Sequence, residues 1–213
     1  MSLELLTQAP LFAGAGLTLR TKKGMRMGVG AGVLPGLYIA TINDTATSLD
    51  LYPKETATLI EGVLARSLVM TAQVGWGGAD GSGFFVDLGY AVVALGGSAS
   101  GQEALGEMSD VDITELAAAA ADQDYAIDSM LHMVRVEVGW IWRLGARVDL
   151  RASIGGAFTA AAQTTITPPG GGGGALDRFR RRLAKAAEDE LDATYTRDVH
   201  TPTAGLALSW RMF

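Results

Sequence analysis

Two neighbouring segments between residues 133 and 158 alternate between apolar and polar side chains, and this pattern constrains the fold most. In the first segment, one face carries Val134, Val136, Val138, Trp140, Trp142 and Leu144. In the second, after a break at Gly145, the corresponding face carries Val148, Leu150, Ala152, Ile154 and Phe158. Successive side chains of a strand point to opposite faces, so each segment has a continuous apolar surface about ten residues long. That length suits a tilted strand that crosses a bilayer.

Five further segments show the same alternation, which gives seven strands. Their apolar positions fall within residues 11–19, 25–33, 68–76, 84–92 and 204–212. Bacterial single-chain barrels have an even number of strands, so we expect eight, with the missing strand preceding Leu11 and pairing with the last. Because residues 2–8 provide only a stub, we infer that an upstream strand has been removed or that a strand within 41–66 is overlooked.

The connections between these segments are alternately short and long. Short turns lie around residues 21–23, 77–83 and 145–147, whereas long connections lie at about 41–58, 98–129 and 162–199. Barrels of the bacterial outer membrane have short periplasmic turns and long extracellular loops. The pattern therefore predicts that the three long connections share one side of a membrane and that Phe213 lies on the other.

Two of the long connections contain helix signals. Asp112–Glu115 has the spacing of a capping box before an alanine run. Residues 176–191 carry an apolar stripe at helical spacing, and the flexible Gly170–Gly174 run precedes them. In this second segment basic residues come first and acidic residues follow, which opposes the helix dipole. We expect a short helix in each connection.

Composition limits the function classes. Hydrophobic residues make up 48% of the 213 residues and charged residues 19%, yet no apolar run approaches the ~18 residues of a membrane helix. The 28 glycines argue against a helical bundle. A net charge of −6, without basic patches between aromatics, disfavours nucleic acid as a partner. The absence of cysteine excludes disulfides and thiol chemistry.

The start of the chain has no signal-peptide pattern, because Met1–Glu4 lacks a basic segment and an apolar core. A protein of the outer membrane must be exported. We therefore expect the chain to be a mature or trimmed form, with its signal peptide removed.

The polar face of the strands distinguishes a membrane barrel from a soluble one. A soluble barrel needs Lys, Glu and Thr on its exterior, but here that face is rich in glycine, which weakens exposed strands and suits a crowded lumen. The same face carries the charges that we expect in the lumen: Asp87, Arg135, Glu137, Arg143, Asp149 and Arg151. They could line a pore or pair in a closed interior, and a narrow barrel favours the paired interior. A tight turn at 145–147 would place Arg143 opposite Asp149.

Four aromatic residues of the apolar face lie near short turns or the end of the chain: Trp76, Phe84, Trp142 and Trp210. At one level they would form an aromatic girdle at a membrane interface. Ordinary core aromatics are the alternative explanation.

Over nearly its whole length, this pattern resembles the small outer-membrane β-barrels of the OmpA/OmpX kind. The terminal residues include Leu206, Leu208, Trp210 and Phe213, which resemble the insertion signal of that class. The resemblance implies the bacterial outer membrane as location, its lipid bilayer as environment, and recognition of the C-terminal segment by the barrel-assembly machinery. Trp210 and Phe213 are out of phase, which departs from the family's pattern.

The sequence offers few candidates for chemistry. His132 and His200 have no Ser/acid partner at a recognisable spacing. Asp122, Asp124 and Asp128 offer oxygen ligands for calcium but lack the Gly and Glu of a dedicated loop. Gly28-x-Gly30-x-Gly32 lacks the helix of a nucleotide loop. We expect no catalytic residue, no cofactor and no metal.

The sequence predicts one all-β domain over residues 1–213: a transmembrane, antiparallel, up-and-down β-barrel of about eight strands, with short helices in the long loops. We expect it to present these loops for a structural role or for a protein partner. The alternatives are a small channel, a lipid-modifying barrel enzyme that uses His132 or His200, and a soluble lipocalin-like carrier.

Overall fold

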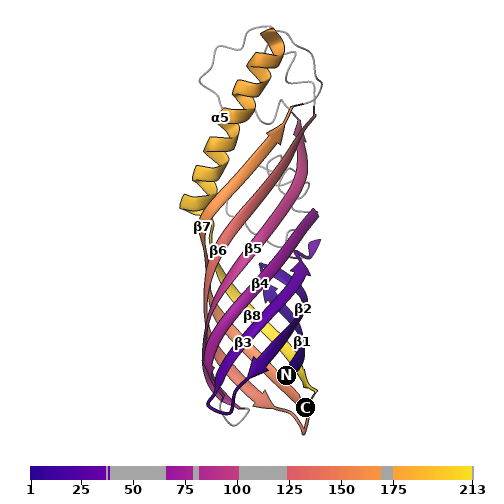
Figure 1. Ribbon diagram of the computed structural model, residues 1–213, viewed down its shortest axis with the longest axis vertical. Coiled ribbons are helices and arrows are strands. Elements are labelled where there is room, and N and C mark those ends of the chain that lie inside the picture. The colour runs from indigo at the N-terminus through magenta and orange to yellow at the C-terminus, as the bar shows by residue number, and fades with distance from the viewer. Residues whose placement is uncertain (37, 39–65, 79–81, 101–123, 169–174, 213) are drawn as a thin grey trace.

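A computed structural model describes residues 1–36, 38, 66–78, 82–100, 124–168 and 175–212. Within them, eight antiparallel strands close into one barrel in their order along the chain (Figure 1). The strands are β1 (Ser2–Ala9), β2 (Phe12–Arg20), β3 (Met25–Val33), β4 (Arg66–Gly77), β5 (Gly83–Ser100), β6 (Asp124–Arg143), β7 (Val148–Thr167) and β8 (His200–Arg211). The predicted fold class is confirmed.

Strand β1 is the strand that the sequence analysis did not count. It pairs with β2 on one side and with β8 on the other, so that Leu5 lies opposite Ala15 and Leu208. Both explanations offered for the missing strand are therefore wrong, although its expected position before Leu11 is right. The consecutive Leu5 and Leu6 hide the alternation, since only one of two neighbouring side chains can face outward.

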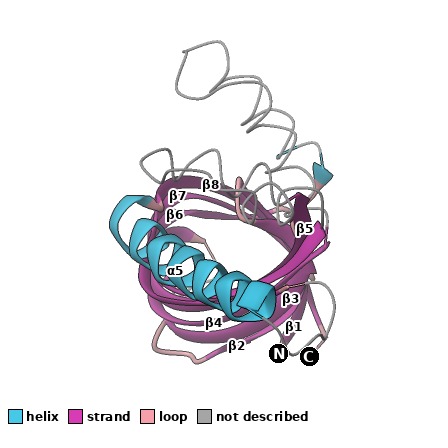
Figure 2. Ribbon diagram, turned by 90° about the horizontal axis from the view of Figure 1, so that it is seen from above, coloured by secondary structure: helices cyan, strands magenta, loops and turns pink. Residues whose placement is uncertain are grey.

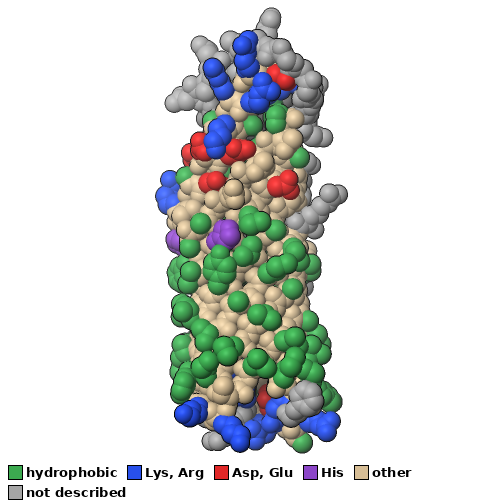
Figure 3. All heavy atoms as spheres, viewed as in Figure 1, with side chains coloured by type: hydrophobic (Ala, Val, Ile, Leu, Met, Phe, Trp, Pro, Cys, Tyr) green, Lys and Arg blue, Asp and Glu red, His purple; other side chains and the backbone are tan. Residues whose placement is uncertain are grey.

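The apolar faces point outward. Leu5, Val29 and Ile154 have exposed fractions of 63%, 61% and 67%. Figure 3 shows such side chains as a broad band around the lower part of the barrel. Because a soluble carrier needs a polar exterior, the lipocalin-like alternative is wrong.

The connections differ at the two ends of the barrel. The turns at 21–24 and 144–147 and the neighbouring ends of β4 and β5 lie at the same end as both termini (Figure 1). The strand ends that flank the long connections lie at the other end, where β1 and β2 are also joined, by Pro10 and Leu11. The barrel thus has a short-turn end and a long-loop end.

Strands β5, β6 and β7 have 18, 20 and 20 residues and extend further towards the long-loop end than their neighbours. The predicted loops at 98–129 and 162–199 therefore contain strand. The sequence analysis ended these strands early because the outward face becomes polar beyond the membrane band, as at Asp128 and Thr165.

The long-loop end also carries helix α5 (Ala175–Asp198). The helix predicted at residues 176–191 is confirmed. The helix signal at Asp112–Glu115 and the run Gly170–Gly174 lie outside the described residues.

No helix in the described part of the chain is long and apolar enough to cross a membrane.

The β1–β8 register can be tested by cross-linking. Because Leu5 and Leu208 are direct partners, Leu5→Cys with Leu208→Cys should form a disulfide under mild oxidation, within the short Cα distance that such a bond requires. Gel mobility after proteolysis between the two sites would detect it. The control pair Leu5→Cys with Trp210→Cys is shifted by two residues and should link much less. Equal cross-linking of both pairs would contradict the register.

Candidate functional site: the barrel lumen

The lumen contains a charge network in which Asp87 is central. Its carboxylate is buried and forms an ion pair with Arg26 of β3, and it lies 3.5 Å from a guanidinium nitrogen of Arg151 on β7. The Arg26 guanidinium also lies over the ring of Phe85, 4.3 Å from its centroid, as in a cation–π contact. Asp87 therefore joins three strands through one carboxylate.

Two further carboxylates extend the network. Glu4 of β1 lies 3.5 Å from Arg151 and accepts a 2.9 Å hydrogen bond from the Ser209 hydroxyl. Glu137 of β6 pairs with Arg135 and accepts a 2.5 Å hydrogen bond from the Gln8 amide. The network thus connects β1 with β6, β7 and β8 across the seam at which β1 and β8 close the barrel.

Asp149 lies closer to the short-turn end. Its carboxylate lies 3.7 Å from Arg20 and 3.4 Å from Arg211. Arg143 is its register partner on β6, as the sequence analysis predicted, but the Arg143 side chain is exposed. Since Arg143 is the last residue of β6, it lies at the rim.

Of the six charged residues proposed for the lumen, the structure buries Asp87, Arg135, Glu137, Asp149 and Arg151. The sequence analysis did not propose Glu4, Gln8, Arg20, Arg26 and Arg211. Glu4 and Gln8 belong to the uncounted strand. Arg20, Arg26 and Arg211 lie on the polar face of their strands, as the proposed residues do. Their place in the alternation is the signal that could have identified them.

Glycines leave room for the charged side chains. A Cβ atom at Gly75 would lie 1.7 Å from an Asp87 carboxylate oxygen, and one at Gly139 would lie 2.0 Å from the carbonyl oxygen of Ala152 and 2.8 Å from the Phe85 ring. All three distances are shorter than real Cβ contacts. Glycine on the inner face therefore permits the buried carboxylate and ring, as expected for a narrow lumen.

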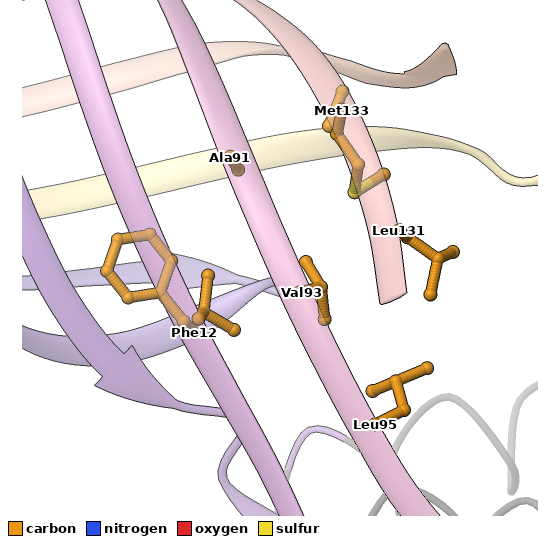
Figure 4. Packing of buried hydrophobic residues seen from close by; sticks show 8 residues of the cluster. Phe12, Ala91, Val93, Leu95, Leu131 and Met133 are labelled. Atoms are coloured by element: carbon orange, nitrogen blue, oxygen red, sulfur yellow. The ribbon is translucent and has the colours of Figure 1, made fainter. Parts of the chain in front are cut away.

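Apolar side chains lie on both sides of the charge network. Towards the short-turn end, Phe85 and Ile141 are buried. Towards the long-loop end there is an apolar layer, part of which Figure 4 shows. It consists of Phe12, Val69, Ala91, Val93, Leu95, Leu131, Met133 and Ala157. Both β5 and β6 show this order on their inner face. From the short-turn end towards the long-loop end, a buried apolar residue comes first, charged residues follow, and the apolar layer comes last.

Helix α5 lies against the extended parts of β6 and β7. Ala184, Ala187 and Leu191 pack with Tyr125 and Ile166. Near the C-terminal end of the helix, Tyr195 contacts the apolar layer, as does Val199 directly after the helix. Burial raises the pKa of the Tyr195 phenol. Seen from above, α5 runs across the mouth of the barrel (Figure 2).

The helix also covers a free sheet edge. The β7–β8 ladder ends at the pair Phe158 and His200, but β7 continues to Thr167. Glu188 of α5 accepts a 2.9 Å hydrogen bond from the backbone N–H of Ile166 on that edge. An exposed strand edge invites pairing with other chains, so α5 protects the edge that β8 leaves open.

The space left within the charge network is small. One cavity, lined among others by Gln8, Arg135 and Glu137, has a volume of about 10 Å³, and a second, beside Glu4 and Gln73, is equally small. Each volume is roughly that of one water molecule. At these two places the lumen is closely packed.

The histidines and the acidic cluster do not form a catalytic or metal site among the described residues. The His132 Nδ1 atom is hydrogen-bonded to the Tyr90 hydroxyl, and the His200 ring lies 5.7 Å from that of Phe158. Both histidines therefore contact aromatic side chains of the outer surface. Asp122 lies outside the described residues, and Asp128 is exposed.

The aromatic residues proposed as a girdle lie near the short-turn end. Trp76, Phe84, Trp142 and Trp210 have exposed fractions between 43% and 60%, and Trp140 lies directly opposite Phe84. Leu206 and Leu208 share the outer face of β8 with Trp210, whereas Phe213 lies outside the described residues.

No family model matches the sequence, and no curated protein matches it. Among solved structures, the chain is similar to a major outer membrane protein from Thermus thermophilus, with 11% identity, a TM-score of 0.43, and 98% of this chain and 99% of that chain covered. It is also similar to CarO from Acinetobacter baumannii, with 8% identity, a TM-score of 0.37, and 99% and 96% covered.

The architecture itself decides the class of protein. Eight antiparallel strands form a closed barrel with an apolar exterior and a charged interior. The chain is a transmembrane β-barrel of the outer-membrane type. Eight strands is the number in small barrels of the OmpA/OmpX kind, and the architecture agrees with the predicted location in a bacterial outer membrane.

The charge network generates a stability prediction. Asp87→Ala leaves Arg26 buried without its carboxylate, and we expect it to lower the free energy of unfolding by roughly 3–5 kcal/mol, the range for breaking a buried ion pair. Replacing both partners, as Asp87→Leu with Arg26→Met, should cost less, because no unpaired buried charge remains at this pair. Urea titration of the protein in lipid vesicles, followed by tryptophan fluorescence, measures both values. An Asp87→Ala variant as stable as the wild type would contradict the network.

Proposed function

We propose that this protein is a closed, non-conducting anchor in the bacterial outer membrane. In this proposal it presents a surface module at its long-loop end. The described part of the module consists of the extended parts of β5, β6 and β7 and helix α5. The barrel fixes the module to the membrane, and the module carries recognition.

The observation that carries the proposal is the layered lumen. A channel needs a continuous hydrated path, but along β5 and β6 the paired charges lie between buried apolar side chains. Tyr195 of α5 and Val199, which directly follows the helix, pack against the layer at the long-loop end. This arrangement supports a closed barrel over the channel alternative.

The outer surface of α5 supports a role in recognition. Its first half exposes Arg178, Arg181 and Arg182, and its second half exposes Asp189 and Glu190. Only part of this charge is paired within the helix, as in the 2.9 Å contact of Lys185 with Asp189. Side chains on a rigid scaffold above a membrane are well placed for a protein partner.

One further role belongs to the proposal. The outer face of β8, with Leu206, Leu208 and Trp210, is the segment that we expect the barrel-assembly machinery to recognise. Catalysis is not part of it, since within the described residues neither His132 nor His200 contacts a serine or a carboxylate, as a lipid-modifying enzyme would require.

Conductance tests the closed lumen. In planar bilayers the purified protein should give no stable channel steps, because apolar layers interrupt the polar interior. Arg135→Ala and Glu137→Ala serve as lumen variants. Stable steps in the wild type, with a size that these substitutions change, would overturn the proposal in favour of a channel.

Labelling tests the orientation of the module. Since the native chain has no cysteine, Lys185→Cys on α5 and Lys23→Cys in the β2–β3 turn are single reporters, both at exposed positions. A membrane-impermeant maleimide added to intact cells should label the α5 cysteine and spare the turn cysteine. Both should react after the cells are broken. The reverse pattern in intact cells would place the module in the periplasm.

A further inference from the structure

The short-turn end carries exposed cations that have no ion-pair partner among the described residues: Lys22 and Lys23 in the β2–β3 turn and Arg147 in the β6–β7 turn. Asp149 follows Arg147 by two residues but does not neutralise these cations, because it is buried and is bound by Arg20 and Arg211. Figure 3 shows basic side chains gathered at this end, below the apolar band. We call Lys22, Lys23 and Arg147 the basic rim.

Tryptophan side chains adjoin both parts of the basic rim. Met25, at the end of the β2–β3 turn, pairs with Trp76, and Val148, directly after Arg147, pairs with Trp210. The other tryptophans of the chain, Trp140 and Trp142, are near the end of β6. Indole side chains are enriched at the headgroup level of a bilayer, so the rim cations lie at or just beyond that level.

We propose that the basic rim binds the headgroups of anionic glycerophospholipids in the leaflet that surrounds it. The phosphates of such lipids lie at the level of the rim, and no carboxylate among the described residues pairs with the lysines or Arg147. Membrane surfaces with anionic lipids attract lysine and arginine side chains, and the exposed tryptophans contact the adjoining acyl chains. The site is distinct from the module at the long-loop end and does not depend on its role.

The tryptophans themselves provide the readout, because all 4 of the chain's tryptophans lie at the short-turn end. The protein is folded into phosphatidylcholine vesicles that contain either brominated phosphatidylglycerol or, at the same mole fraction, brominated phosphatidylcholine. Bromine quenches indole fluorescence at contact. We expect phosphatidylglycerol to quench more strongly at low ionic strength, and the difference should disappear in 1 M salt, where the Debye length is about 3 Å.

Two matched variants separate charge from folding. The glutamine variant removes the three charges by the substitutions Lys22→Gln, Lys23→Gln and Arg147→Gln. The charge-conserving variant keeps them by the substitutions Lys22→Arg, Lys23→Arg and Arg147→Lys. We expect the relative affinity for phosphatidylglycerol to fall on the order of fivefold for each cation removed, and to persist in the charge-conserving variant. Heat-modifiable gel mobility checks that both variants fold.

Three results would overturn the proposal. The wild type could show equal quenching by the two lipids. The glutamine variant could retain the preference, or the charge-conserving variant could lose it. If the glutamine variant does not fold, the salt dependence of the wild-type preference still decides, since a preference unchanged in 1 M salt contradicts binding by the rim charges.

Discussion

Closure of the barrel by the β1–β8 ladder is the constraint on which the rest of the structure depends. A bilayer core offers no water to unpaired backbone N–H and C=O groups, so a sheet can cross it only when no edge is left open. Residues Ser2–Gln8 of β1 pair with β2 on one side, and residues Ser2–Ala9 pair with β8 on the other. Glu4 and Gln8 of the same strand join the charge network. The strand that completes the backbone pairing thus also contributes side chains to the interior.

Closure divides the side chains between two environments. The outer face meets lipid and is apolar, whereas the inner face buries carboxylates and guanidinium groups, such as Asp87 and Arg26, that require partners. Glycine at Gly75 and Gly139 leaves the space in which these groups meet. Beyond the membrane band, the backbone groups at the sheet edge also need partners. There β7 extends past the end of β8, and α5 covers the exposed backbone of β7. Neighbouring strands and the helix thus supply the partners that these polar groups need.

For most strands, the sequence predicted which residues face outward and which face inward. The reason is that lipid requires apolar side chains outside, whereas the lumen holds polar or small side chains. Val134 and Arg135, for example, are assigned to the correct faces by alternation alone. Strand ends were less predictable. The upper parts of β6 and β7 leave the lipid, so residues such as Asp128 lose the outward apolar signal. Ion-pair partners were the least predictable feature. Arg26 and Asp87 lie on either side of Gly75, which is the register partner of both, and Arg151 comes from β7. These contacts depend on strand registers and on closure of the barrel, which the alternation of residues along one strand does not specify.

The central claim is that the inner face of the barrel is packed and the outer face meets lipid. Single cysteines along β6, modified by a small charged methanethiosulfonate reagent or by a membrane-soluble maleimide, test it most directly in lipid vesicles. The account predicts that cysteines at the inward Met133 and Ile141 resist both reagents, and that one at the outward Val134 reacts only with the membrane-soluble reagent. Rapid modification of the inward positions by the charged reagent would show a water-filled lumen and contradict the account.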